Sequence, residues 1–166
     1  MYREQPHSRI AQICLNGHII SSILESPEDS RGTYCSQCGK PTITECKNCN
    51  KPIEGDYYNP DVVVIAEFDP DPFCKYCGKP FPWTQAKLDA AKDIIDLESE
   101  LGKEEKDALK MSLDDIISEN PRSKVGALKI KRLVTKVGLE TGKALRDIAI
   151  DIASETAKKI LLGNSS

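Results

Sequence analysis

The 166-residue chain has few aromatic residues and no long apolar run, and both shortages narrow its class. It contains 3 Phe, 5 Tyr and 1 Trp, and residues 84–166 hold none of them. The lack of any apolar run of roughly 18 residues excludes a transmembrane helix. Apolar residues make up 39 % of the chain, below the roughly 45–50 % typical of globular proteins. A core this small usually depends on metal ions or disulfides.

Disulfides do not suit the seven cysteines of this chain. Their number is odd, so a closed set of disulfides would leave one thiol over. Residues 1–8 (MYREQPHS) are polar and do not resemble a signal peptide. We therefore expect a cytoplasmic protein whose cysteines stay reduced.

Composition changes sharply near Trp83. All seven cysteines lie between Cys14 and Cys77, and Pro121 is the only one of the 10 prolines that follows Trp83. This change predicts two domains: a small metal-stabilised β region over residues 1–83 and an all-α helical region over residues 84–166.

The cysteines and one histidine form four closely spaced pairs. Seven Cys and His18 give eight ligands, enough for two tetrahedral sites: Cys14/His18, Cys35/Cys38, Cys46/Cys49 and Cys74/Cys77. Two intervening residues allow a tight turn to point both sulfurs at one ion. A histidine within a soft sulfur set favours zinc, so we predict two Zn²⁺ per chain, arranged as tandem zinc ribbons. Buried free cysteines and an iron–sulfur cluster are the alternatives.

The sequence favours sequential pairing of the ligands, in which Cys14/His18 share an ion with Cys35/Cys38 and the later two pairs share another. The alternative joins the two middle pairs and closes the outer pairs together. Gly39, Asn50 and Gly78 follow the second ligand of a pair, where positive φ is expected.

Strand propensity accompanies these ligand pairs. We expect strands at Ile10–Cys14, His18–Leu24, Thr42–Thr44 and Val62–Phe68. The aromatic residues near the second site are expected to form a small core: Tyr57, Tyr58, Phe68, Phe73, Tyr76, Phe81 and Trp83.

The second half of the chain has helical periodicity. Its apolar spacing and breaks predict helices at about 84–101, 103–119, 121–137 and 140–162, with Thr84 capping the first. Gly138 and Gly142 indicate a break, a kink or a close helix contact, which leaves open whether residues 121–162 form one kinked helix or two.

Charge separates the helical region into two segments of opposite sign. Residues 84–120 carry 5 Lys or Arg and 11 Asp or Glu, whereas residues 121–166 carry 10 and 4. Packing of one segment on the other is therefore expected. A basic cluster is the candidate nucleic-acid site: Lys124, Lys129, Lys131, Arg132 and Lys136. No aromatic residues accompany it for base stacking, and a solvated helix face is the simpler interpretation.

Four segments resemble a family of short bacterial proteins known only as a domain of unknown function: residues 11–20 (AQICLNGHII), 34–49 (YCSQCGKPTITECKNC), 73–84 (FCKYCGKPFPWT) and 146–161 (RDIAIDIASETAKKIL). The resemblance spans nearly the whole chain and supports the same eight zinc ligands. It implies no activity.

The sequence favours a non-catalytic, zinc-binding interaction or adaptor module rather than an enzyme. Four protein ligands fill each expected site, and no HExxH or zinc-deaminase motif occurs. We expect the helical region to bind a protein partner or a second copy of the chain, with nucleic-acid binding through residues 121–136 as the alternative. No small-molecule substrate is inferred.

Overall fold

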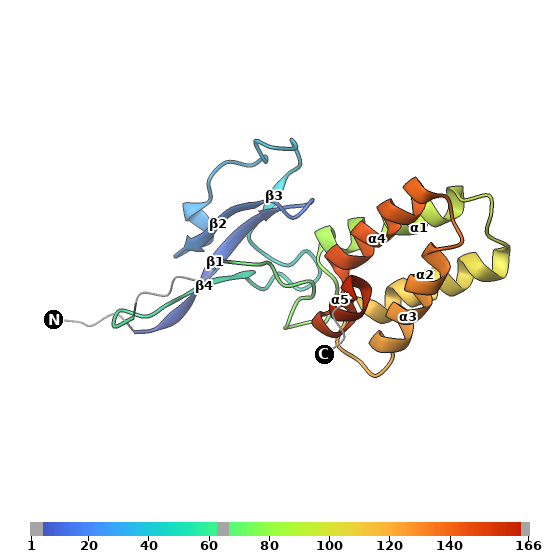
Figure 1. Ribbon diagram of the computed structural model, residues 1–166. Coiled ribbons are helices and arrows are strands. Elements are labelled where there is room, and N and C mark those ends of the chain that lie inside the picture. The colour runs from blue at the N-terminus through green and yellow to red at the C-terminus, as the bar shows by residue number, and fades with distance from the viewer. Residues whose placement is uncertain (1–4, 63–66, 164–166) are drawn as a thin grey trace. The chain divides into compact units, whose positions relative to one another are not determined.

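The computed structural model describes residues 5–62 and 67–163. The chain divides into two compact units, an N-terminal unit of residues 1–84 and a helical unit of residues 85–166. Figure 1 shows the strands in the first unit and the helices in the second. A β region followed by an all-α region is the order that the sequence predicts.

Strand β1 (His7–Cys14) organises the sheet of the N-terminal unit, because it pairs antiparallel with each of the other three strands (Figure 1). These are β2 (Ile19–Leu24), β3 (Thr42–Ile43) and β4 (Glu54–Tyr58). β4 pairs with the start of β1 and β3 with its end, where Cys14 lies opposite Thr42. A short 3-10 helix, η1 (Pro27–Asp29), follows β2. The strand expected at Val62–Phe68 falls on residues 63–66, which lie outside the described residues.

The core of the N-terminal unit is small and includes two of the cysteines. Its buried residues are Ala11, Ile13, Cys46, Ile53, Cys74, Phe81 and Trp83. The Phe81 and Trp83 rings stack with centroids 4.6 Å apart, and the Trp83 indole donates to the Asp71 carbonyl. The aromatic core expected from sequence was partly wrong: Tyr57 and Tyr76 are about half exposed, because the sheet and turns that carry them direct their polar rings to solvent.

The helical unit contains five helices in its described part, where the sequence predicts four. They are α1 (Pro82–Leu97), α2 (Lys103–Ile116), α3 (Ser123–Val134), α4 (Leu139–Ile152) and α5 (Glu155–Leu162). α1 begins with proline at a first-turn position, where its missing N–H costs nothing. Thr84 therefore does not cap it, and the Thr84 hydroxyl donates to the Pro72 carbonyl instead.

The single helix predicted over residues 140–162 was wrong, since the chain leaves helical geometry at Ala153 and Ser154. The Ser154 N–H donates to the Ile116 carbonyl at 2.7 Å, at the end of α2. The Thr156 N–H donates to Glu119 at 2.8 Å. These two hydrogen bonds to a distant segment replace helical ones. The helical spacing of apolar residues continues through the break, so it could not predict it.

The helical unit packs around aliphatic side chains that include Ile95, Leu109, Leu113, Ile116, Ile130 and Leu145. α2 and α3 approach closely at Gly126, where an added Cβ would lie 2.9 Å from the Ser112 carbonyl oxygen. Arg122 pairs with Asp115 and Lys136 with Glu105. The basic segment thus docks partly on the acidic one, as their charges predict.

The break expected near Gly138 is present, because α3 ends at Val134 and Gly138 precedes α4. Gly142 is also a close contact, since an added Cβ there would lie 2.9 Å from the Val134 carbonyl oxygen. Among the described residues, no helix combines the length and the apolar character needed to cross a membrane.

Candidate metal centres

The N-terminal unit brings the eight predicted ligands into two groups of four. Cys14, His18, Cys35 and Cys38 form the first cluster, and Cys46, Cys49, Cys74 and Cys77 form the second. Within each cluster, the possible ligand atoms all lie within 4.8 Å of one another. This is the sequential pairing that the sequence favours.

Three of the ligand pairs share one backbone geometry. In each, the N–H of the first cysteine donates to a lysine carbonyl five residues later, at 2.8 Å for Cys35–Lys40 and Cys46–Lys51 and 2.9 Å for Cys74–Lys79. The residue after the second cysteine has positive φ: 68° at Gly39, 57° at Asn50 and 69° at Gly78. This confirms the conformations expected at these three positions.

A repeated octapeptide encodes this geometry. The pattern of one residue, CxxC, Gly or Asn, then Lys-Pro occurs at residues 34–41, 45–52 and 73–80. Its first residue forms a β-bridge with its final proline in all three copies. The prediction from ligand spacing did not include this repeated Lys-Pro ending. The octapeptide repeat accounts for the three similar turns beside the two clusters.

The remaining ligand pair lies in the turn between β1 and β2. The Cys14 N–H donates to the His18 carbonyl at 3.0 Å, and Gly17 has a φ of 92°. The His18 N–H points at the Cys14 sulfur at 3.3 Å. Trp83 packs beside this turn, since a Cβ added at Gly17 would lie 3.1 Å from the Trp83 Cβ.

The separations of donor atoms agree closely between the two clusters. In the first, the sulfurs of Cys14 and Cys38 are 3.7 Å apart. His18 Nδ1 lies 3.4 Å from the Cys14 sulfur and 3.6 Å from the Cys35 sulfur. In the second, Cys46 and Cys77 are 3.8 Å apart and Cys49 and Cys74 are 3.7 Å apart. Four donors at such distances suit one ion between them.

The local backbone favours thiolates at some of these positions. The Lys79 N–H lowers the pKa of Cys77 to about 6. Burial raises the pKa of Cys35, but the N–H groups of Gln37 and Cys38 outweigh it and bring that pKa to about 7.

Other sulfurs of the clusters resist ionisation. The Lys51 N–H lowers the pKa of Cys49, but burial and three neighbouring thiols outweigh it and raise the pKa to about 12. Burial likewise raises the pKa of Cys14. The first cluster has three thiols and the second has four. Adjacent thiolates repel one another, so full ionisation of either set requires a cation among them.

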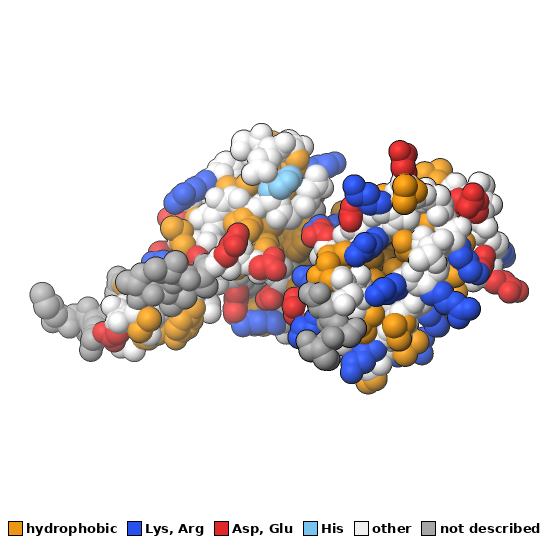
Figure 2. Space-filling model, in the orientation of Figure 1, with side chains coloured by type: hydrophobic (Ala, Val, Ile, Leu, Met, Phe, Trp, Pro, Cys, Tyr) orange, Lys and Arg blue, Asp and Glu red, His pale blue; other side chains and the backbone are white. Residues whose placement is uncertain are grey.

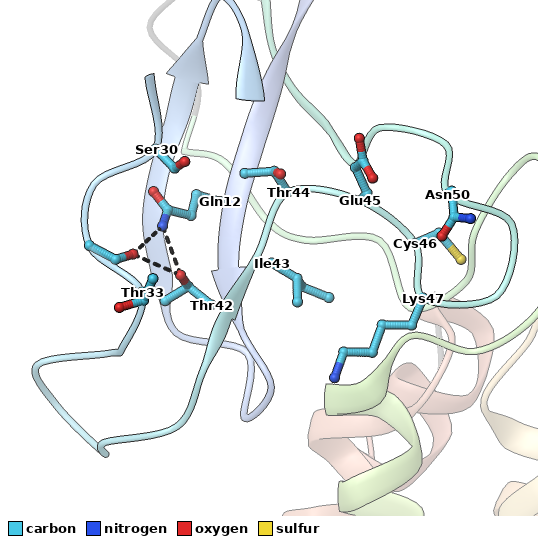
Figure 3. A pocket seen from close by; sticks show the side chains of 11 residues that line it. Gln12, Ser30, Thr33, Thr42, Ile43, Thr44, Glu45, Cys46, Lys47 and Asn50 are labelled. Carbon is cyan, nitrogen blue, oxygen red and sulfur yellow. Dashed lines mark hydrogen bonds between the residues drawn. The ribbon is translucent and has the colours of Figure 1, made fainter. Parts of the chain in front are cut away.

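A wide pocket of about 550 Å³ lies in the N-terminal unit, and Cys46 and Asn50 line it together with several threonines (Figure 3). The buried Gln12 amide donates to the Gly32 carbonyl and to Thr42 Oγ1, both at 2.8 Å. Its oxygen accepts from the Arg31 N–H at 2.6 Å. These internal hydrogen bonds assign Gln12 a structural role, in holding residues 31–32 against β1 and β3.

The basic cluster lies on and just after α3. Lys124, Lys129 and Arg132 are exposed, whereas Lys131 donates to the Ile160 carbonyl and Lys136 pairs with Glu105 at 2.7 Å. Figure 2 shows many Lys and Arg side chains over this unit. Two of the five predicted nucleic-acid contacts are therefore engaged within the chain itself.

Comparison with known families gives one match that covers most of the chain. A family described as an uncharacterized protein conserved in bacteria (DUF2321) matches residues 7–161. The chain belongs to this family. The match includes all eight predicted ligands and the five helices up to Leu161, and it confirms the resemblance to a bacterial domain of unknown function. Searches of curated proteins and of solved structures give no match.

Proposed function

We propose that this DUF2321 protein is a non-catalytic interaction module of the bacterial cytoplasm. Two structural zinc ions hold its N-terminal unit, and its helical unit binds a protein partner or a second copy of the chain. The observation that carries the proposal is the geometry of the two donor clusters.

Tetrahedral zinc accounts for the donor separations. Zn–S bonds of about 2.3 Å at tetrahedral angles place two sulfurs about 3.8 Å apart, and Zn–N bonds of about 2.0–2.1 Å place sulfur and nitrogen about 3.6 Å apart. The observed sulfur–sulfur separations are 3.7–3.8 Å, and the sulfur–nitrogen separations are 3.4 and 3.6 Å. The His18 nitrogen in a sulfur-rich set favours zinc over an iron–sulfur cluster.

Complete coordination supports a structural role. Each cluster offers four protein donors, whereas catalytic zinc keeps a position open for water or substrate. In the adjoining pocket, the buried Gln12 amide is fully engaged with neighbouring residues. Reduced cysteines, which zinc binding needs, are normal in the cytoplasm.

Elemental analysis of the full-length protein, purified under reducing conditions without added metal, tests this function. We expect two zinc ions per chain, one for each cluster. Chelation is expected to release both and to unfold the N-terminal unit. Protein that is fully folded without zinc, or that holds iron in its place, would contradict the proposal. Hydrolytic activity lost on chelation would contradict its non-catalytic part.

A further inference from the structure

The outward side of α3 combines positive charge with exposed apolar side chains. Lys124, Val125, Leu128, Lys129 and Arg132 form this basic face. Val125 is 45 % exposed and Leu128 is 58 % exposed. Their spacing of three and four residues places them on one side of the helix, away from the buried Gly126, Ala127 and Ile130.

The cations of the basic face have no acidic partner among residues 5–62 and 67–163. Within the described residues, Lys124, Lys129 and Arg132 form no ion pair, whereas Arg122 and Lys136 do. No Asp or Glu occurs between Glu119 and Glu140. Along α3 itself, therefore, the charged residues beside Val125 and Leu128 are all cations.

The outward side of α2 has the opposite charge. Glu104, Asp107 and Met111 form an acidic stripe, spaced three and four residues apart, and Met111 is 64 % exposed. In the described part of the chain, Glu104 and Asp107 form no ion pair. The neighbouring Lys106 donates to the Asp96 carbonyl and Lys110 to the Asp96 carboxylate. Lys103, at the first position of α2, directly precedes Glu104.

These two surfaces complement each other in charge and in apolar content. Both lie opposite the buried sides of helices that pack together within one unit. A two-fold axis would place α2 of each copy against α3 of the other, so every favourable contact would occur twice. Met111 would then meet Val125 and Leu128 between flanking charges of opposite sign.

Nucleic acid and a membrane fit these two surfaces less well than a second copy of the chain does. The basic face presents aliphatic residues and no aromatic rings for base stacking. An anionic membrane surface would attract the basic face but repel the adjacent acidic stripe, and the unit has no Trp or Phe to anchor it there.

We propose that the basic face of α3 binds the acidic stripe of α2 in a second copy of this chain, forming a symmetric dimer. The proposal rests on the proposed function, because it names the partner of the helical unit. Repulsion between like charges would disfavour other alignments of the two copies.

Analytical ultracentrifugation of the zinc-loaded full-length chain tests this dimer. We expect a concentration-dependent monomer–dimer equilibrium that weakens as salt rises. The variant Lys129→Glu/Arg132→Glu makes both surfaces acidic, and Glu104→Lys/Asp107→Lys makes both basic. Each variant alone is expected to dimerise at least about tenfold more weakly than the wild type.

An equimolar mixture of the two variants gives the decisive result. Both interfaces of the mixed pair join opposite charges, so the mixture is expected to form a heterodimer. The variant Lys143→Glu/Lys159→Glu is the matched control, because it changes the net charge equally at exposed positions of α4 and α5. It is expected to dimerise more strongly than Lys129→Glu/Arg132→Glu. Circular dichroism checks that all variants are folded.

A wild-type chain that stays monomeric at high concentration and low salt would overturn the dimer. So would variants that dimerise normally, or a mixture that stays monomeric. A monomer that instead binds duplex DNA in a salt-sensitive way would assign the basic face to nucleic acid. Zinc content, measured on the same samples, decides separately whether the metal part of the proposed function holds.

Discussion

The two units are similar in length but differ in what stabilises their folds. The N-terminal unit has short strands, three CxxC turns and a small core in which Cys46 and Cys74 are buried. The helical unit has a longer set of buried aliphatic residues and contains no cysteine. We therefore expect side-chain burial to suffice for the second unit, and the first unit to depend on metal binding at its two Cys/His clusters.

Among the changes that test this difference between the units, removal of one predicted ligand is expected to have the largest effect on stability. His18→Ala deletes a donor of the first cluster, and each structural site contributes on the order of 10 kcal/mol to folding. We expect the variant to lose zinc and to unfold the N-terminal unit. Its fluorescence reports this directly, because the one tryptophan of the chain, Trp83, is buried there.

His7→Ala is the matched control, since His7 is the other histidine and binds Glu25 on the surface. It should keep two zinc ions and the wild-type fluorescence. If His18→Ala keeps as much zinc as His7→Ala, His18 is not a ligand.

The second-largest effect is expected from a substitution that creates a cavity in the helical core. Leu113 is 2 % exposed in the core, and Leu113→Ala should reduce the free energy of unfolding by about 2–5 kcal/mol. Met111→Ala on the same helix should change it by less than about 0.5 kcal/mol, because Met111 is 64 % exposed. Urea unfolding followed by circular dichroism measures both. The comparison fails if Leu113→Ala also releases zinc while its helices remain folded.

Loss of the Asn120 side chain should have an intermediate effect. Its amide donates to the carbonyls of Asp115 and Ser118 at the end of α2, and its oxygen accepts the Arg122 N–H. Asn120→Ala leaves these groups without their partner, at a cost of about 1–3 kcal/mol. The exposed amide Gln85 bonds only to Asp89 among the described residues, so Gln85→Ala should be nearly neutral. Equal unfolding midpoints for the two variants would refute this role of Asn120.

The smallest expected effect is a pH dependence of the helical unit. The Thr156 N–H holds the pKa of Glu119 below its usual 4.5. The Glu119 carboxylate therefore stabilises the folded state above pH 4.5, and this contribution disappears as pH falls through the folded-state pKa. Glu119→Gln should show a smaller loss of stability between pH 5 and pH 3 in thermal unfolding, by the linkage between protonation and folding. Identical pH profiles would rule out this contact as a source of acid sensitivity.

The sequence predicts the two Cys/His clusters because the signals for them are local. A CxxC turn, the following Gly or Asn and the missing eighth ligand at His18 are all visible over a few residues. Sequential pairing also follows, since the two loops are long enough to bring the pairs together. The exposure of Tyr76 was not predictable from spacing, because it depends on Glu54, a distant residue that accepts its hydroxyl hydrogen bond.

The limits of prediction in the helical unit are similar. Helical periodicity locates the helices, and Gly138 and Pro121 indicate their breaks. The break at Ala153–Ser154 depends on Ile116 and Glu119, which lie far away in the sequence. The pairing of the basic segment with Asp115 and Glu105 follows from charge, but which cations stay unpaired depends on helix packing.

Hydrogen exchange, measured by mass spectrometry on the full-length protein with and without a zinc chelator, tests the central claim most directly. The account predicts that chelation removes protection from residues 7–84, while residues 85–162 keep theirs. Protection that persists in residues 7–84 without zinc, or that is lost together in both units, would contradict it.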